Sequence, residues 1–110
     1  MTTSPESLTW HVVLRLEELP TDGSGKTVEV NGQRIALFHH EGTVYCLDDS
    51  CPHQGASLGE GLISMTDVTC PWHGFHYDLA TGANTDGIGE CGVATHPVDV
   101  TDGGEVRVAL

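Results

Sequence analysis

Residues 51–61 read CPHQGASLGEG, and residues 70–82 read CPWHGFHYDLATG. Each stretch opens with a cysteine followed closely by a histidine, which gives four candidate metal ligands: Cys51, His53, Cys70 and His73. A thiolate is a soft ligand that suits iron–sulfur clusters, and an imidazole is a common ligand for transition metals. Two thiolates can therefore bind one iron of a [2Fe–2S] cluster while two imidazoles bind the other iron.

Short Cys/His spacings also occur in zinc sites. Zinc motifs usually separate paired ligands by two or more residues, whereas Pro52 alone separates Cys51 from His53. Zinc gives no reason for the proline after each cysteine or for the glycine after His73. We therefore favour the iron–sulfur cluster and keep a zinc-binding structural module as an alternative.

With these two motifs, the chain resembles the Rieske iron–sulfur domains. Within that family it is most similar to the small soluble Rieske ferredoxins and to the small subunits of assimilatory NAD(P)H nitrite reductases. The resemblance implies one [2Fe–2S] cluster per chain, with Cys51 and Cys70 on one iron and His53 and His73 on the other. It also implies that each histidine binds iron through Nδ1, so that Nε2 lies near solvent on the path of the electron.

Five more residues of the two stretches are expected to surround the cluster: Gly55, Trp72, Gly74, Phe75 and Tyr77. The two glycines would let the backbone approach the cluster, unless they serve the turns alone. Trp72 would shield the cluster or form part of a docking face. Respiratory Rieske proteins have a serine at the position of Phe75, and losing its hydrogen bond should lower the reduction potential. Tyr77 would bond a cysteine sulfur or pack in the core.

The remaining cysteines do not fit the ligand pattern. Cys46 is expected to be a buried apolar side chain, and Cys91 a free thiol. Respiratory Rieske proteins carry one extra cysteine in each stretch, joined as a disulfide, but here Ala56 and Trp72 stand at those positions. This departure favours the ferredoxin-like branch and suits a reducing compartment. We assign no ligand role to His76.

Alternation of apolar and polar residues predicts an all-β fold. Strands are expected at 8–14, 27–30, 34–39, 43–47, 67–70, 75–78, 95–100 and 105–110. We expect one Rieske domain over residues 1–110, in which antiparallel sheets from the two terminal portions form a sandwich or barrel. A cluster-binding subdomain would be inserted at about residues 46–82.

The formal net charge of −12 disfavours nucleic acid and anionic membranes as partners. It favours docking onto a basic patch of another protein, although solubility alone is a simpler explanation. No apolar run approaches the roughly 20 residues of a membrane span, and the first residues do not resemble a signal peptide. We therefore expect a cytoplasmic monomer.

The resemblance implies a one-electron carrier rather than an enzyme. Rieske ferredoxins take electrons from a flavin-dependent reductase and pass them, by transient docking, to a terminal ring-hydroxylating oxygenase. An oxygenase would need a second iron site of two histidines and a carboxylate in a larger domain. The alternative function is that of a permanent small subunit in a nitrite reductase complex.

Overall fold

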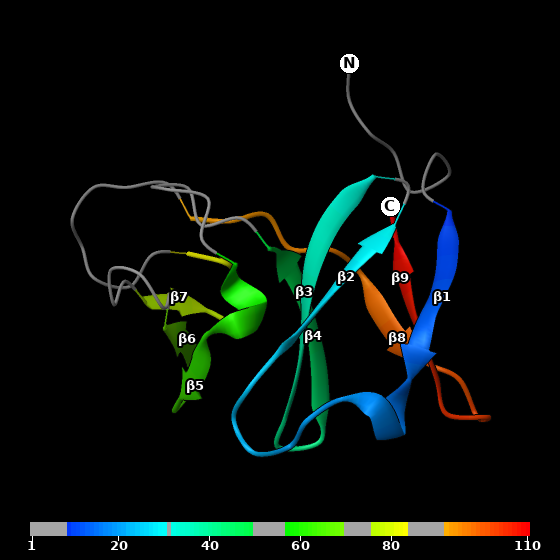
Figure 1. Ribbon diagram of the computed structural model, residues 1–110, viewed down its shortest axis with the longest axis horizontal. Helices are drawn as coiled ribbons and strands as arrows, with labels where there is room; N and C mark the ends of the chain where they lie inside the picture. The colour runs from blue at the N-terminus through cyan, green and yellow to red at the C-terminus, as the bar shows by residue number, and fades with distance from the viewer. Residues whose placement is uncertain (1–8, 31, 50–56, 70–75, 84–91) are drawn as a thin grey trace.

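A computed structural model describes residues 9–30, 32–49, 57–69, 76–83 and 92–110. These residues form three antiparallel sheets of three strands each, which lie in a row in Figure 1. The predicted all-β class is confirmed: the helices of the described ranges are single 3₁₀ turns, η2 (Leu16–Glu18) and η3 (Leu58–Glu60). None of the described helices has the length and apolar character that crossing a bilayer requires.

The first sheet joins the two ends of the described chain. Its order is β1 (Trp10–Arg15), β9 (Glu105–Ala109) and β8 (Val98–Val100). Backbone hydrogen bonds between Thr9 and Leu110, at 3.0 and 3.1 Å, extend the pairing of β1 and β9 to its end. The N-terminal and C-terminal portions therefore share one sheet, as the alternation in both portions suggested.

The second sheet is a meander of β2 (Lys26–Val30), β3 (Gln33–His40) and β4 (Thr43–Asp48). Val30 pairs with Gln33, so the predicted hairpin around residues 31–32 is confirmed. The second turn is equally tight, because His40 pairs with Thr43 across Glu41 and Gly42. Both turn residues have a positive φ, 51° at Glu41 and 82° at Gly42, as a type I′ turn requires.

The third sheet consists of β5 (Leu62–Ser64), β6 (Asp67–Thr69) and β7 (His76–Asp78). Neither β5 nor η3 was predicted from the sequence. Each is three residues long, which is too short to show a period. All three strands and η3 fall within the subdomain that we propose for residues 46–82.

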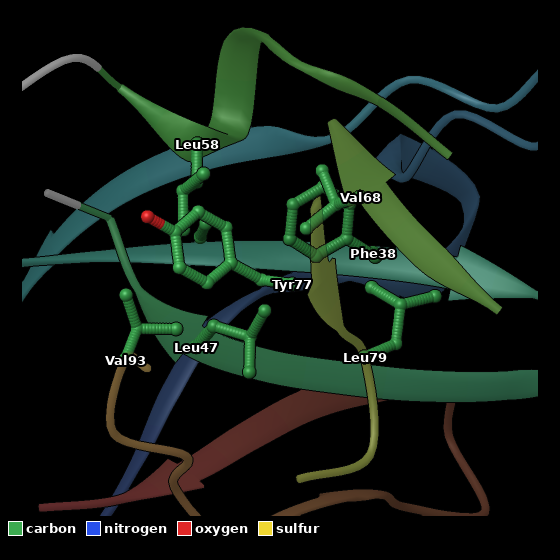
Figure 2. Packing of buried hydrophobic residues seen from close by; sticks show 8 residues of the cluster. Phe38, Leu47, Leu58, Val68, Tyr77, Leu79 and Val93 are labelled. Atoms are coloured by element: carbon green, nitrogen blue, oxygen red, sulfur yellow. The ribbon is translucent and has the colours of Figure 1, made fainter. Parts of the chain in front are cut away.

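The second sheet is covered on both faces. Ile35 and Leu37 of β3 pack with the first sheet, whereas Ala36 and Phe38 pack with η3 and the third sheet. Figure 2 shows Phe38 and Leu47 of the second sheet among Leu58, Val68, Tyr77 and Leu79. This double coverage explains why the four consecutive residues 35–38 are all fully buried.

The prediction of one strand over 95–100 was wrong at its start, since β8 begins at Val98. The residues before it bond to β4 instead: His96 N donates to Cys46 O at 3.0 Å, and Asp48 N donates to Ala94 O at 2.9 Å. This segment therefore links the first sheet to the second rather than extending the final hairpin.

The turn at Glu41 yields a stability prediction. A non-glycine residue in the left-handed region costs about 1–2 kcal/mol, and asparagine tolerates that region better than glutamate. Glu41→Asn should therefore raise the free energy of unfolding by about 0.5–1 kcal/mol. The contact of Glu41 with His40, 3.2 Å long, is ionic only when His40 is protonated, and it should contribute little because Glu41 is 79% exposed.

The midpoint of thermal unfolding of the cluster-loaded protein, followed by circular dichroism, measures this change. Gly42→Ala is the matched control at the neighbouring position, and it should lower the midpoint because alanine is strained at a φ of 82°. A midpoint that falls in both variants would contradict the proposed strain at Glu41.

Candidate metal centre

The four predicted ligands lie outside the described residues, as do four of the five residues expected around the cluster. These are Cys51, His53, Gly55, Cys70, Trp72, Gly74 and Phe75, together with His73. The structure instead describes the residues that flank two shorter ligand-bearing stretches, residues 50–56 and 70–75, which we call the first and second stretch. We call these flanking residues, together with the contacts between them, the frame; the chain enters and exits each stretch from it.

The first stretch is flanked by Asp49 and Ser57, which are in direct contact. Ser57 Oγ donates to Asp49 Oδ1 at 2.9 Å. Leu58 N donates to the backbone oxygen of Asp49 at 2.7 Å. The chain therefore leaves and rejoins the frame at one place, and residues 50–56 carry the first Cys/His pair between these two points.

Asp49 is fully buried, and its carboxylate is extensively bonded. Oδ1 accepts hydrogen bonds from Thr27 Oγ1, Ser57 Oγ and Gly59 N, each at 2.9 Å. Oδ2 lies 2.9 Å from Nη2 of Arg34, which is an ion-pair distance, but it accepts no hydrogen bond from the described residues. A buried carboxylate needs such compensation because its desolvation is costly.

The second stretch is flanked by a strand pair. Thr69 at the end of β6 pairs with His76 at the start of β7, and residues 70–75 connect them. Thr69 also pairs with Leu62, which follows η3. A Cβ added to Gly61 would lie 2.2 Å from the backbone oxygen of Thr69. The end of η3 therefore abuts the start of the second stretch.

Both flanking regions rest on one apolar cluster. Leu58 follows the first stretch, Tyr77 follows the second, and Val68 precedes the second; all three are fully buried in the same cluster. Figure 2 shows the Tyr77 ring beside Leu58 and Val93. The described residues on either side of both stretches therefore share one core.

The expectation that Tyr77 packs in the core is met by its buried ring. Its bond to a cysteine sulfur stays a prediction, because Cys51 and Cys70 lie outside the described residues. His76 is half-buried in β7.

Cys46 is a free, buried thiol in β4, as the sequence indicated. Burial, with a smaller contribution from the carboxylate of Asp48, raises the pKa of Cys46 to about 12. Such a thiol stays protonated and does not bind iron as a thiolate. Within the described ranges there is no group of three or more His, Cys, Asp or Glu side chains that could hold a metal ion. Cys91 lies outside those ranges.

The buried network at Asp49 was missed in the sequence analysis. An acidic residue next to a cysteine has no distinctive pattern, and Thr27 and Arg34 lie far from Asp49 in the sequence. The available signal was the pair Asp48–Asp49 at the end of an apolar strand, directly before the first ligand stretch.

The donor set and the frame fit a mixed-ligand iron–sulfur cluster. The two thiolates and two imidazoles that the sequence predicts as ligands would come from two stretches whose flanking residues share one core. The Rieske [2Fe–2S] domain matches residues 9–97. The chain belongs to the Rieske family. As a Rieske domain it has one [2Fe–2S] cluster per chain, which sets the zinc alternative aside.

A similar protein of known function is the ferredoxin subunit of the 3-phenylpropionate/cinnamic acid dioxygenase of Photorhabdus laumondii. It is 39% identical, and the alignment covers 83% of this chain and 86% of the relative. The likeness therefore extends over most of both chains rather than over the two motifs alone.

Solved structures agree on the fold. The ferredoxin of carbazole 1,9a-dioxygenase from Nocardioides aromaticivorans superimposes with a TM-score of 0.82 at 28% identity, covering 91% of this chain and 96% of that one. A ferredoxin chain in a complex of reduced oxygenase and oxidised ferredoxin superimposes with a TM-score of 0.81 at 28% identity. That match covers 91% of this chain and 92% of the other. A chain assigned as the small subunit of an NADH-dependent nitrite reductase from Mycobacterium tuberculosis gives 0.84 at 24% identity, covering 94% and 96%; this last likeness is one of fold.

The ligand assignment predicts which substitutions remove the cluster. Cys51→Ser and His73→Ala should each lose the intact cluster, because a thiolate or an imidazole ligand is removed. Cys46→Ala is the matched control, since it removes a cysteine that the frame does not use. Iron and acid-labile sulfide content and the visible absorption of each purified variant measure the outcome. An intact cluster in Cys51→Ser, or an empty Cys46→Ala, would contradict the assignment.

The raised pKa of Cys46 predicts resistance to alkylation. At pH 8 a thiol with a pKa of about 12 is ionised in about one molecule in ten thousand, and the thiolate is the reactive form. Iodoacetamide should therefore leave Cys46 unmodified in the folded protein and modify it after unfolding in urea. Peptide mass spectrometry locates the modification. Rapid labelling at Cys46 in the folded protein would contradict its burial.

Proposed function

We propose that this Rieske protein is a one-electron carrier that takes electrons from a flavin-dependent reductase and delivers them to a terminal, ring-hydroxylating oxygenase. One observation carries the proposal: the alignment with a dioxygenase ferredoxin subunit covers most of both chains. The carrier itself performs no substrate chemistry.

The cluster, when bound, supplies a centre that gains and loses one electron. The residues of this chain that would hold it are Cys51, Cys70, His53 and His73. The frame around Asp49, Thr69 and Tyr77 would keep both ligand stretches fixed while the charge of the site changes by one unit. A rigid frame suits electron transfer, since it limits the rearrangement that accompanies each change of charge.

The charge distribution supports a basic partner. The four Lys and Arg residues are Arg15, Lys26, Arg34 and Arg107, so residues 35–106 contain none. The same range holds most of the Asp and Glu residues of the chain. The third sheet and both ligand stretches therefore come from the part of the sequence that attracts a positively charged surface.

The outward face of the third sheet offers an apolar contact beside the second ligand stretch. Leu62, Thr69 and His76 are paired across β5, β6 and β7, so their side chains share one face of the sheet. Leu62 is 62% exposed. We propose that Leu62 contacts the oxygenase when the carrier docks, because it lies in the same row as the residues that flank 70–75.

A purified three-component assay tests the carrier function. NADH, a flavin-dependent reductase and the terminal oxygenase of a 3-phenylpropionate dioxygenase system would be combined with and without this protein. Hydroxylated product should form only when the protein is present and loaded with its cluster. Reduction by the reductase without any oxygenase turnover would contradict delivery to this class of oxygenase.

The likeness in fold to a nitrite reductase small subunit supports a second candidate function, that of a permanent subunit in such an enzyme. A permanent subunit would remain bound to a large subunit at nanomolar concentration, whereas a carrier would dissociate and sediment as a monomer. Affinity purification of the tagged protein from its own cells, followed by analytical ultracentrifugation, distinguishes the two functions.

Docking should depend on salt and on Leu62. The rate of electron transfer to the oxygenase should fall as ionic strength rises to about 0.15 M, where the screening length is about 8 Å. Leu62→Ser should lower that rate roughly tenfold at a low protein concentration, the effect of about 1.4 kcal/mol in binding. Stopped-flow absorption of the reduced protein mixed with oxygenase measures both effects.

Met65→Ser is the matched control for Leu62→Ser. Met65 is 86% exposed and lies in the same hairpin, at the turn between β5 and β6, away from the strand ends that flank 70–75. Its substitution should leave the rate unchanged. Equal losses in the two variants would count against a docking role specific to Leu62.

A further inference from the structure

We propose that Asp49 is a positioning residue for the first ligand pair, and that Arg34 offsets its negative charge at the cluster and so raises the reduction potential. The inference rests on the cluster of the proposed carrier but not on its partners. It follows from the contacts of one buried carboxylate that adjoins the first ligand stretch.

Asp49 ties three separate parts of the chain to the start of that stretch. Thr27 belongs to β2, Arg34 belongs to β3, and Ser57 follows residues 50–56. Thr27 Oγ1 and Ser57 Oγ donate to the same oxygen of Asp49, each at 2.9 Å. The backbone of Asp49 also donates to Arg34 O at 3.3 Å. One side chain thus ties the described residues on both sides of 50–56 to the second sheet.

The packing around this network leaves no room for adjustment. Gly59 N donates to Asp49 Oδ1 at 2.9 Å. A Cβ at Gly59 would lie 2.0 Å from Thr27 Oγ1 and 3.0 Å from Asp49 Oδ1, so only glycine fits. Three hydrogen bonds to Oδ1 and this close packing fix the position of the carboxylate. The residues bonded to it are therefore fixed as well.

The network brings charge close to the ligands. Asp49 precedes Cys51 by two residues, so their Cα atoms lie within about 7 Å. A fully buried carboxylate is poorly screened, and a negative charge near the cluster disfavours the added electron. The guanidinium of Arg34 lies 2.9 Å from Oδ2 and opposes that effect. The net charge of Asp49 and Arg34 together should therefore contribute to the reduction potential of the cluster.

The test is protein-film voltammetry of cluster-loaded variants, which needs neither reductase nor oxygenase. Arg34→Gln removes the positive charge but keeps a side chain that can donate to Asp49, so the potential should fall. Arg34→Lys keeps the charge and should return the potential toward the wild-type value. Asp49→Asn removes the negative charge and should shift the potential upward.

Arg15→Gln is the matched control. Arg15 is 53% exposed and lies 2.9 Å from Glu17, while Arg34 is 52% exposed and lies 2.9 Å from Asp49. The two substitutions thus remove the same charge from equally exposed arginines, although Glu17 is 74% exposed and Asp49 is fully buried. Arg15 lies on the first sheet, and Arg34 lies on the second sheet next to Asp49. Arg15→Gln should shift the potential less than Arg34→Gln does.

The electron paramagnetic resonance spectrum of the reduced variants tests positioning separately from charge. Displaced ligands should change the g values in Asp49→Ala, whereas Arg15→Gln should keep the wild-type spectrum. Equal potential shifts in Arg34→Gln and Arg15→Gln would overturn the charge role. Wild-type g values in Asp49→Ala would overturn the positioning role. Voltammetry and the spectrum need no partner protein, so a negative result in them would not contradict the proposed carrier function. A lack of oxygenase turnover in the three-component assay would likewise not contradict the roles of Asp49 and Arg34.

Discussion

The burial of the second sheet on both faces is the constraint on which the rest of the structure depends. Alternate residues of β3 contact different cores: Ile35 and Leu37 face the first sheet, and Ala36 and Phe38 face the third. Short strands such as β5 and β6 cannot bury an apolar face alone. They gain a partner only because the second sheet offers its outer face, and so the frame of the ligand stretches depends on a sheet that contributes none of the four ligands.

The same arrangement explains how much of the fold could be predicted. The hairpin of β2 and β3 was predicted because Asn31-Gly32 stands between two alternating runs. The all-apolar run 35–38 marks a strand buried on both faces, but it does not reveal what covers each face. The strand β5 was missed, since Leu62-Ile63-Ser64 is too short to show a pattern and forms because Thr69 pairs with Leu62.

The family could be predicted from the sequence because the two Cys/His motifs are formed by residues that are close neighbours in the chain, and the family match confirms it. The assignment of the four ligands stays a prediction, since Cys51, His53, Cys70 and His73 lie outside the described residues. The buried carboxylate of Asp49 depends on Thr27 and Arg34, which the fold brings to it from other strands. Long-range polar contacts of this kind leave no local signal, so only a structure can find them.

The pairing of Thr9 with Leu110 has a practical consequence. Both residues adjoin the end of the first sheet, and the second sheet separates that sheet from the third, as Figure 1 shows. A peptide tether added after Leu110 would therefore leave the molecule on the side away from Leu62 and the flanks of both ligand stretches. The protein could be fused to a reductase, or attached to a solid support through this end, while the third sheet still faced solution. The fold thus separates the point of attachment from the third sheet, beside which we propose that electrons are exchanged.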